Sequence, residues 1–175
     1  MLAVAGLRVI VNRQTGFSLL TNFTPIGAMA LFGGAYFNIS WKAYLFPLLT
    51  LWISDLVLSR FVYQHQWQLF YHGAYWIYAA FVLMVVAGKY LLKDVSVKNV
   101  LLSALAITVI HWVIADIGVF SGGILYPATI SGWWTCMAAA ILFERNFLCG
   151  TLLYVAIMFG SFEWMKTEYP SLTMA

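Results

Sequence analysis

The sequence predicts an all-α integral membrane protein, folded as a single helical bundle with six or seven transmembrane helices. Of its 175 residues, 63% are apolar or aromatic and only 9% are charged, whereas a soluble domain carries roughly 25% charged residues. Several apolar stretches also approach the ~20 residues that a helix needs to cross the hydrocarbon core of a bilayer. A soluble globular protein is therefore excluded, and one transmembrane domain, residues 1–175, accounts for the whole chain.

The apolar segments follow one another with short polar connections. The first, 1–11, covers only about 16 Å as a helix, so it either crosses as a short span or lies in the interface. The second, 25–37, has a well-marked start, because Thr24 can cap the helix and Pro25 suits its first turn. Three longer segments follow at 41–59, 73–92 and 97–120. We expect two more helices, 128–143 and 147–165, separated by a polar connection at 144–146.

Lysine and arginine residues in the connections predict the orientation of the bundle. If the last six segments all cross, one side carries Lys42, Lys89, Lys93, Lys98 and Arg145. The opposite side then carries Arg13, Arg60 and Lys166. We expect the lysine-rich 89–98 connection to face the cytoplasm. The net charge of +3 is too small, and too scattered, to predict a nucleic-acid partner.

Three connections with polar, aromatic or glycine residues fall together on the predicted outer side: 21–25, 60–73 and 121–127. Asp55 and Asp116 lie near the outer ends of their segments, so both carboxylates belong to the same rim. Asp116 precedes a Ser-Gly-Gly break, and Pro127 begins the next segment. A carboxylate in an apolar medium is costly unless it is neutralised, hydrogen-bonded or hydrated. The rim is therefore interpreted as a binding mouth.

Two interpretations of Asp116 remain open. In the first, it belongs to a solvated site for a small ligand or ion. In the second, its carboxylate only closes the fold by bonding Ser121, Arg60 or a loop N–H group.

The other chemically active side chains favour structural roles. His65 and His72 are expected to anchor the outer interface, and His111 to hydrogen-bond a neighbouring helix. Cys136 and Cys149 are read as small buried hydrophobic residues. No Ser/His/Asp or HExxH arrangement is present, so the sequence predicts neither an enzyme nor a cofactor or metal site. Ala30, Gly33 and Gly34 form a small-residue face that favours close helix contact, within the chain or with a partner.

Three motifs in order carry a family resemblance: NFTPIGAMALFGGAYF, LLTLWISDLVLS, and GVFSGGILYPATISGWWTCMAAAILFERNFLCGTLLYVAIMFG. Together they cover most of residues 22–160 and resemble the DUF6580 family of bacterial membrane proteins, for which a transport role is expected. That family is similar in size and loop arrangement to the S components of energy-coupling-factor transporters, which gather vitamins with their outer loops. The chain has no AxxxA pair, the feature that S components use to dock their ATPase module.

The leading hypothesis is a transport protein of the bacterial inner (cytoplasmic) membrane that binds a small solute, vitamin-like or cationic, at an outer pocket. Its partners would be membrane lipids and the solute. The alternative is a non-transporting accessory or assembly subunit of a larger membrane complex, which would have no cavity between the outer loops. The candidate solute-binding residues are Asn22, Thr24, Asp55, Trp67, Asp116, Ser121, Gly122, Gly123 and Tyr126.

Overall fold

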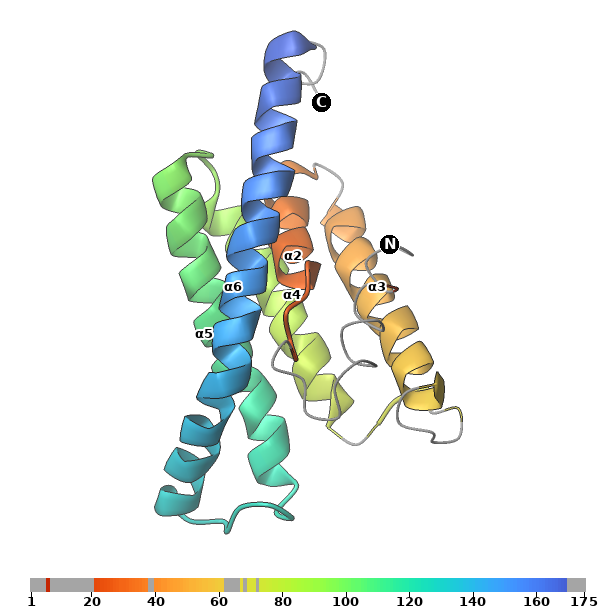
Figure 1. Ribbon diagram of the computed structural model, residues 1–175, viewed down its shortest axis with the longest axis vertical. Coiled ribbons are helices and arrows are strands. Elements are labelled where there is room, and N and C mark those ends of the chain that lie inside the picture. The colour runs from red at the N-terminus through yellow and green to blue at the C-terminus, as the bar shows by residue number, and fades with distance from the viewer. Residues whose placement is uncertain are drawn as a thin grey trace.

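The computed structural model describes residues 6, 21–37, 40–61, 67, 69–71 and 73–169. Over these residues the chain is helical, with no strands, which confirms the predicted all-α class. Figure 1 shows the helices as α2 (Ile26–Tyr36), α3 (Ser40–Phe61), α4 (Ala74–Leu91), α5 (Val97–Ser121) and α6 (Ile130–Glu168). The predicted first segment, 1–11, lies outside the described residues apart from Gly6.

Four of these helices, α3 to α6, are long and apolar enough to cross a membrane. The residues of α5 illustrate why. Its inner face is apolar and buried at Ala104 and Ile107, yet its outer face is equally apolar and exposed at Leu105 and Val109. A helix that is apolar on every side suits a lipid surrounding, where the backbone polar groups must be satisfied within the helix.

The predicted break at 144–146 is wrong. α6 runs without interruption from Ile130 to Glu168, a helix of 39 residues and about 58 Å. Glu144 and Arg145 are good helix formers, and neither glycine nor proline is present in the triplet to end the helix. Glu144 is buried against α5, so its charge marks an interior position and not a connection. The predicted sixth and seventh segments are therefore one helix.

The helix ends sort into two sets. Figure 1 shows that α3 and α5 end, and α4 and α6 begin, at the lower end of the bundle, whereas the C-terminal part of α6 extends past its neighbours at the upper end. α2 is only 11 residues long, so it covers part of the bundle height. The 122–129 connection closes the lower end between α5 and α6. Asp55 and Asp116 both lie within the last two turns before a lower helix end, as predicted.

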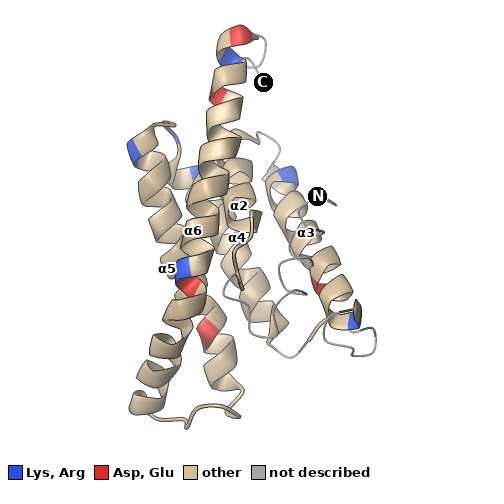
Figure 2. Ribbon diagram, viewed as in Figure 1, with Lys and Arg blue, Asp and Glu red and all other residues tan. Residues whose placement is uncertain are grey.

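The continuous α6 changes the distribution of basic residues between the two ends (Figure 2). Lys166, in the last turn of α6, joins the upper end, which therefore carries Lys42, Lys89, Lys93, Lys98 and Lys166. Arg145 lies inside α6 instead of in a connection. Both predicted placements were wrong because they depended on the break at 144–146. At the lower end, the described helices carry Arg60. The assignment of the upper end to the cytoplasm stays a prediction from the distribution of lysine and arginine.

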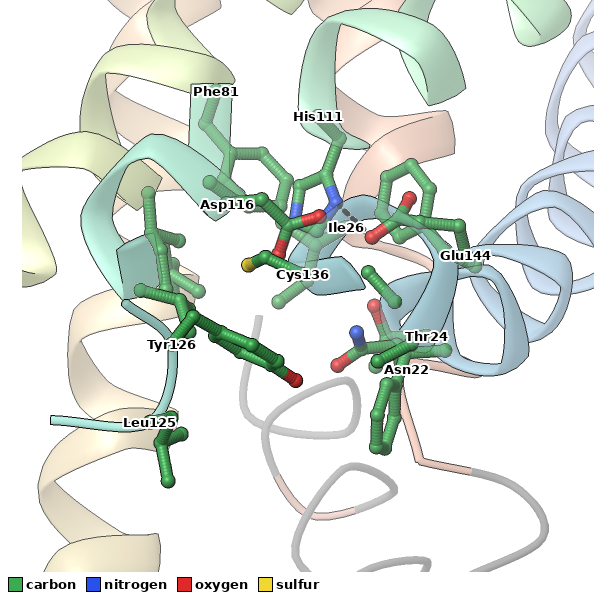
Figure 3. Close-up of a pocket in the computed structure, with 18 residues that line it drawn as sticks. Asn22, Thr24, Ile26, Phe81, His111, Asp116, Leu125, Tyr126, Cys136 and Glu144 are labelled. Carbon is green, nitrogen blue, oxygen red and sulfur yellow. Dashed lines mark hydrogen bonds and ion pairs between the residues drawn. The ribbon is translucent and has the colours of Figure 1, made fainter. Parts of the chain in front are cut away.

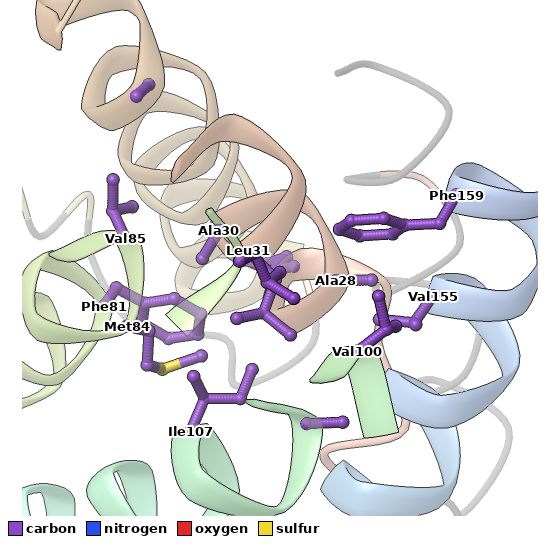
Figure 4. Packing of buried hydrophobic residues seen from close by; sticks show 14 of the residues in the cluster. Ala28, Ala30, Leu31, Phe81, Met84, Val85, Val100, Ile107, Val155 and Phe159 are labelled. Carbon is purple, nitrogen blue, oxygen red and sulfur yellow. The ribbon is translucent and has the colours of Figure 1, made fainter. Parts of the chain in front are cut away.

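The core is centred on α2, which packs against all four other helices. Figure 4 shows Ala28, Ala30 and Leu31 of α2 among buried side chains of α4, α5 and α6. Glycine allows the closest approach: a Cβ atom on Gly34 would lie 2.3 Å from the Val85 carbonyl oxygen of α4. The predicted small-residue face is thus an internal helix contact.

Candidate functional site

A cavity of about 300 Å³ lies in the lower half of the bundle, and we call it the Asp116 cavity (Figure 3). Its walls come chiefly from α4, α5, α6, the start of α2 and the 122–129 connection. The polar and thiol side chains in its wall are those of Asn22, Thr24, His111, Asp116, Tyr126, Cys136 and Glu144. The remaining wall is apolar or aromatic. The described lining contains no lysine or arginine.

His111 and Glu144 join α5 to α6 at the cavity wall. His111 Nδ1 and Glu144 Oε1 share a hydrogen bond of 2.8 Å, and the two residues are each 7% exposed. The imidazole stacks on Phe147, with ring centroids 4.3 Å apart and planes 12° apart. Phe81 of α4 meets the same ring edge-on at 5.7 Å. The prediction that His111 hydrogen-bonds a neighbouring helix is confirmed, and the aromatic contacts fix the orientation of its ring.

Asp116 follows His111 by five residues on α5 and faces the same cavity (Figure 3). It is 8% exposed, and its Oδ2 has no hydrogen-bond partner among the described residues. Glu144 Oε2 is in the same situation. The hydroxyl of Ser121, considered above as a partner that would close the fold, instead donates to the Gly118 carbonyl oxygen at 3.2 Å. Two buried carboxylates thus line one cavity, and each has one oxygen without a partner among the described residues.

The loop before α2 is held against α6, which places Asn22 and Thr24 at the cavity. The amide of Asn146 donates to the Thr21 carbonyl oxygen at 3.1 Å. A Cβ atom on Gly150 would come within 2.9 Å of the Thr24 backbone nitrogen, so glycine permits this close contact. Asn22 has a φ of 67°, a left-handed conformation that asparagine adopts more readily than most residues. The loop is therefore tightly turned and docked.

The 122–129 connection is also shaped by local chemistry. Gly123 has a φ of 64°, which turns the chain after α5. Thr129 then caps α6 by accepting a 3.1 Å hydrogen bond from the Gly132 backbone N–H. A Cβ atom on Gly132 would lie only 2.0 Å from the Pro127 carbonyl oxygen, so the connection folds back closely onto α6. This path brings Tyr126 to the cavity wall.

Comparison with known proteins identifies the family. This chain belongs to DUF6580, a family of unknown function, and the match covers residues 1–172. Neither the curated proteins nor the solved structures contain a match. Membership of DUF6580 confirms the resemblance drawn from the three motifs but assigns no activity. The similarity to S components stays a prediction.

The DUF6580 chain brings together only part of the predicted site. Four of the predicted residues line the Asp116 cavity: Asn22, Thr24, Asp116 and Tyr126. Five do not line it: Asp55, Trp67, Ser121, Gly122 and Gly123. α3 contributes Leu51 to the wall, and Asp55 is a turn further along that helix. Trp67 is 62% exposed and stands edge-on to Phe61. The glycines shape the connection without facing the cavity. His65 and His72 lie outside the described residues.

Sequence reasoning missed Glu144 as a wall residue, because it placed this side chain in a connection. One signal could have identified it. Residues 133–143 before the triplet are mostly apolar and contain no glycine or proline, and the triplet itself contains neither, which is typical of a helix interior. A single acid in such a run must find a buried partner. Its partner, His111, is 33 residues away and was not predictable from spacing.

Proposed function

We propose that this DUF6580 protein is an integral protein of the bacterial inner membrane that binds a small solute in the Asp116 cavity and carries it across. In this proposal α3 to α6 cross the bilayer, and the 21–25 and 122–129 connections receive the solute, much as the outer loops of S components do. Ionisable groups inside a membrane bundle are costly and are typical of substrate, ion or proton pathways. Their convergence on one hollow supports this assignment.

The observation that carries the proposal is the pair of buried carboxylates, Asp116 and Glu144, that line the cavity. Asp116 Oδ2 and Glu144 Oε2 lack partners among the described residues, although both residues are more than 90% buried. A buried polar group without a partner costs about 1–3 kcal/mol. A ligand that hydrogen-bonds these oxygens recovers part of this cost. The cavity volume, about 300 Å³, is at the lower limit of the ~300–1,000 Å³ typical of small-molecule sites.

The alternative, an accessory subunit without transport activity, predicts a filled interior between the outer loops. The Asp116 cavity supports solute binding in preference to it. Two buried carboxylates are not needed in a subunit that serves only as a docking surface. Well-packed apolar residues at those positions often give a protein of equal or greater stability.

A thermal-shift screen of the purified protein tests the proposal. The detergent-solubilised chain is heated with panels of small cationic, neutral and anionic solutes. We expect at least one solute to raise the unfolding temperature of the native protein in a saturable manner and to have no effect on Asp116→Asn. The matched control is Asp55→Asn, which makes the same chemical change outside the cavity and should keep the response. The proposal fails if no solute acts, or if the two variants respond alike.

A further inference from the structure

The charges at the Asp116 cavity do not balance. Its lining holds two carboxylates, Asp116 and Glu144, and His111 can neutralise at most one of them. α2 and α4 begin and α5 ends beside the cavity, so the partial charges of these helix ends, about half a unit each, leave less than one positive charge. The other titratable lining residues, Tyr126 and Cys136, carry no positive charge in either protonation state. Among the described residues, one carboxylate is therefore left to be neutralised by a proton or by a cation.

A bound ammonium group satisfies this site more completely than a proton does. Protonation removes the charge only. An ammonium group removes the charge and also supplies up to three N–H donors. Those donors match the carboxyl groups of Asp116 and Glu144, which line the cavity from α5 and α6. Hydrogen bonds in which both partners are charged are roughly twice as strong as neutral ones.

The wall chemistry distinguishes an organic cation from a metal ion. Among the described residues, no group of three or more His, Cys, Asp or Glu side chains is arranged to hold a metal. Most of the wall is instead apolar, and Phe143 of α6 and Tyr126 of the 122–129 connection supply partly exposed aromatic rings. The rings of Phe81 and Phe147 are buried against His111. Aromatic faces attract organic cations, and an apolar wall favours a ligand with a hydrocarbon body.

From this geometry we infer the class of solute: a small organic monocation, such as a protonated amine with an apolar body, whose ammonium group lies between Asp116 and Glu144. This inference rests on the proposed function, because it names the ligand of the same cavity. Asn22 and Thr24 then face the ligand from the start of α2 as neutral hydrogen-bonding groups.

The native thiol of Cys136 can show whether the cavity prefers cations to anions, even before a solute has been identified. Cys136 lines the cavity close to Asp116 (Figure 3) and is buried. The sequence has two cysteines, so Cys149→Ser leaves Cys136 as the only thiol. We would compare its rates with two methanethiosulfonate reagents of similar size, the cationic aminoethyl and the anionic sulfonatoethyl compound. Because one thiolate attacks both reagents, its own pKa cancels in the ratio of the rates.

We expect the cation-to-anion rate ratio at Cys136 to exceed the ratio at a reference thiol in the 122–129 connection. This reference is Ile124→Cys in a background without Cys136 and Cys149, because position 124 is 88% exposed and lies outside the membrane-spanning helices. Adding Asp116→Asn should lower the Cys136 ratio on the order of tenfold or more, because a unit charge a few ångströms away acts on both reagents with opposite sign. Adding Asp55→Asn should leave it unchanged. Equal ratios at the two thiols, no effect of Asp116→Asn, or no reaction at Cys136 would overturn the inference.

Protection of Cys136 separates this inference from the proposed function. The neutral methyl methanethiosulfonate is applied with increasing benzylamine, benzyl alcohol or benzoate, which share a ring and differ in charge. Benzylamine should slow the reaction at the lowest concentration. If benzyl alcohol or benzoate protects as well or better, the cavity binds a solute but not a cation, so the inference fails and the proposed function stands. If none of the three protects and the thermal-shift screen is also negative, both fail.

Discussion

Replacement of Glu144 by alanine tests whether this residue is buried inside the bundle, as the continuous α6 requires. Glu144 is 7% exposed and hydrogen-bonded to His111 over 2.8 Å. If His111 carries a proton on both nitrogens, removal of the Glu144 carboxylate leaves the charged imidazole buried without a partner, which costs about 3–5 kcal/mol. If His111 is neutral, the loss leaves a buried N–H without an acceptor, which costs about 1–3 kcal/mol. We therefore expect Glu144→Ala to lower the free energy of unfolding by about 1–5 kcal/mol.

Reversible unfolding in mixed detergent and SDS micelles, followed by tryptophan fluorescence, measures this difference. The control is Lys98→Gln in the first turn of α5, at the upper end of the bundle, which is exposed and should change the stability by about 0.5 kcal/mol or less. Glu144→Gln keeps an acceptor oxygen for His111 and should cost less than Glu144→Ala. If Glu144→Ala costs no more than Lys98→Gln, then Glu144 is not a buried interior residue, and the continuous α6 is contradicted.

Two further predictions concern the packing and the orientation. Gly34→Ala should destabilise the protein by about 1–3 kcal/mol, because the new Cβ would lie 2.3 Å from the Val85 carbonyl oxygen. Gly160→Ala, where a Cβ meets nothing within 4 Å, should be neutral or stabilising. The same unfolding assay compares them, and equal losses would contradict the close contact between α2 and α4. In a cysteine-free background, Lys93→Cys should react with impermeant maleimide only from the cytoplasmic side, and Gly123→Cys only from the outer side. Labelling of both from one side would contradict the assigned topology.

Most helices of this chain were predictable because their ends carry local signals. α5 was expected from Val97 and begins there, since Ser96 caps it by accepting a 3.2 Å hydrogen bond from the Asn99 backbone N–H. α4 was expected over 73–92 and runs from Ala74 to Leu91. These signals are set by neighbouring residues in the sequence. They need no knowledge of the rest of the fold.

The course of the chain at 144–146 was not predictable in the same way. A Glu-Arg-Asn triplet between apolar runs is compatible with a connection and with a helix interior. The choice depends on Glu144 meeting His111 of α5 and on Asn146 donating to the Thr21 carbonyl oxygen. Both contacts join residues that are far apart in the sequence. An error at this triplet reversed the predicted position of Lys166.

The candidate site was predictable only where a helix break itself forms the cavity wall. The breaks at 21–25 and 121–127 pointed to Asn22, Thr24 and Tyr126, together with Asp116 one turn before a break, and these four residues line the Asp116 cavity. Asp55 was grouped with them because it shares the lower end of the bundle. Lying toward one end does not place a side chain in the cavity, since α3 packs mainly on α2 and α4. Tertiary packing decides which side chains of a helix point into the cavity.

Solute counterflow in proteoliposomes tests the central claim, transport through the Asp116 cavity, most directly. Vesicles that contain the purified protein are loaded with an unlabelled solute identified by the thermal-shift screen, and entry of the labelled solute is followed. We predict saturable uptake by the native protein and by Asp55→Asn, and uptake at the level of protein-free vesicles for Asp116→Asn. Uptake by Asp116→Asn equal to that of the native protein, or binding without any uptake by the native protein, would contradict the account.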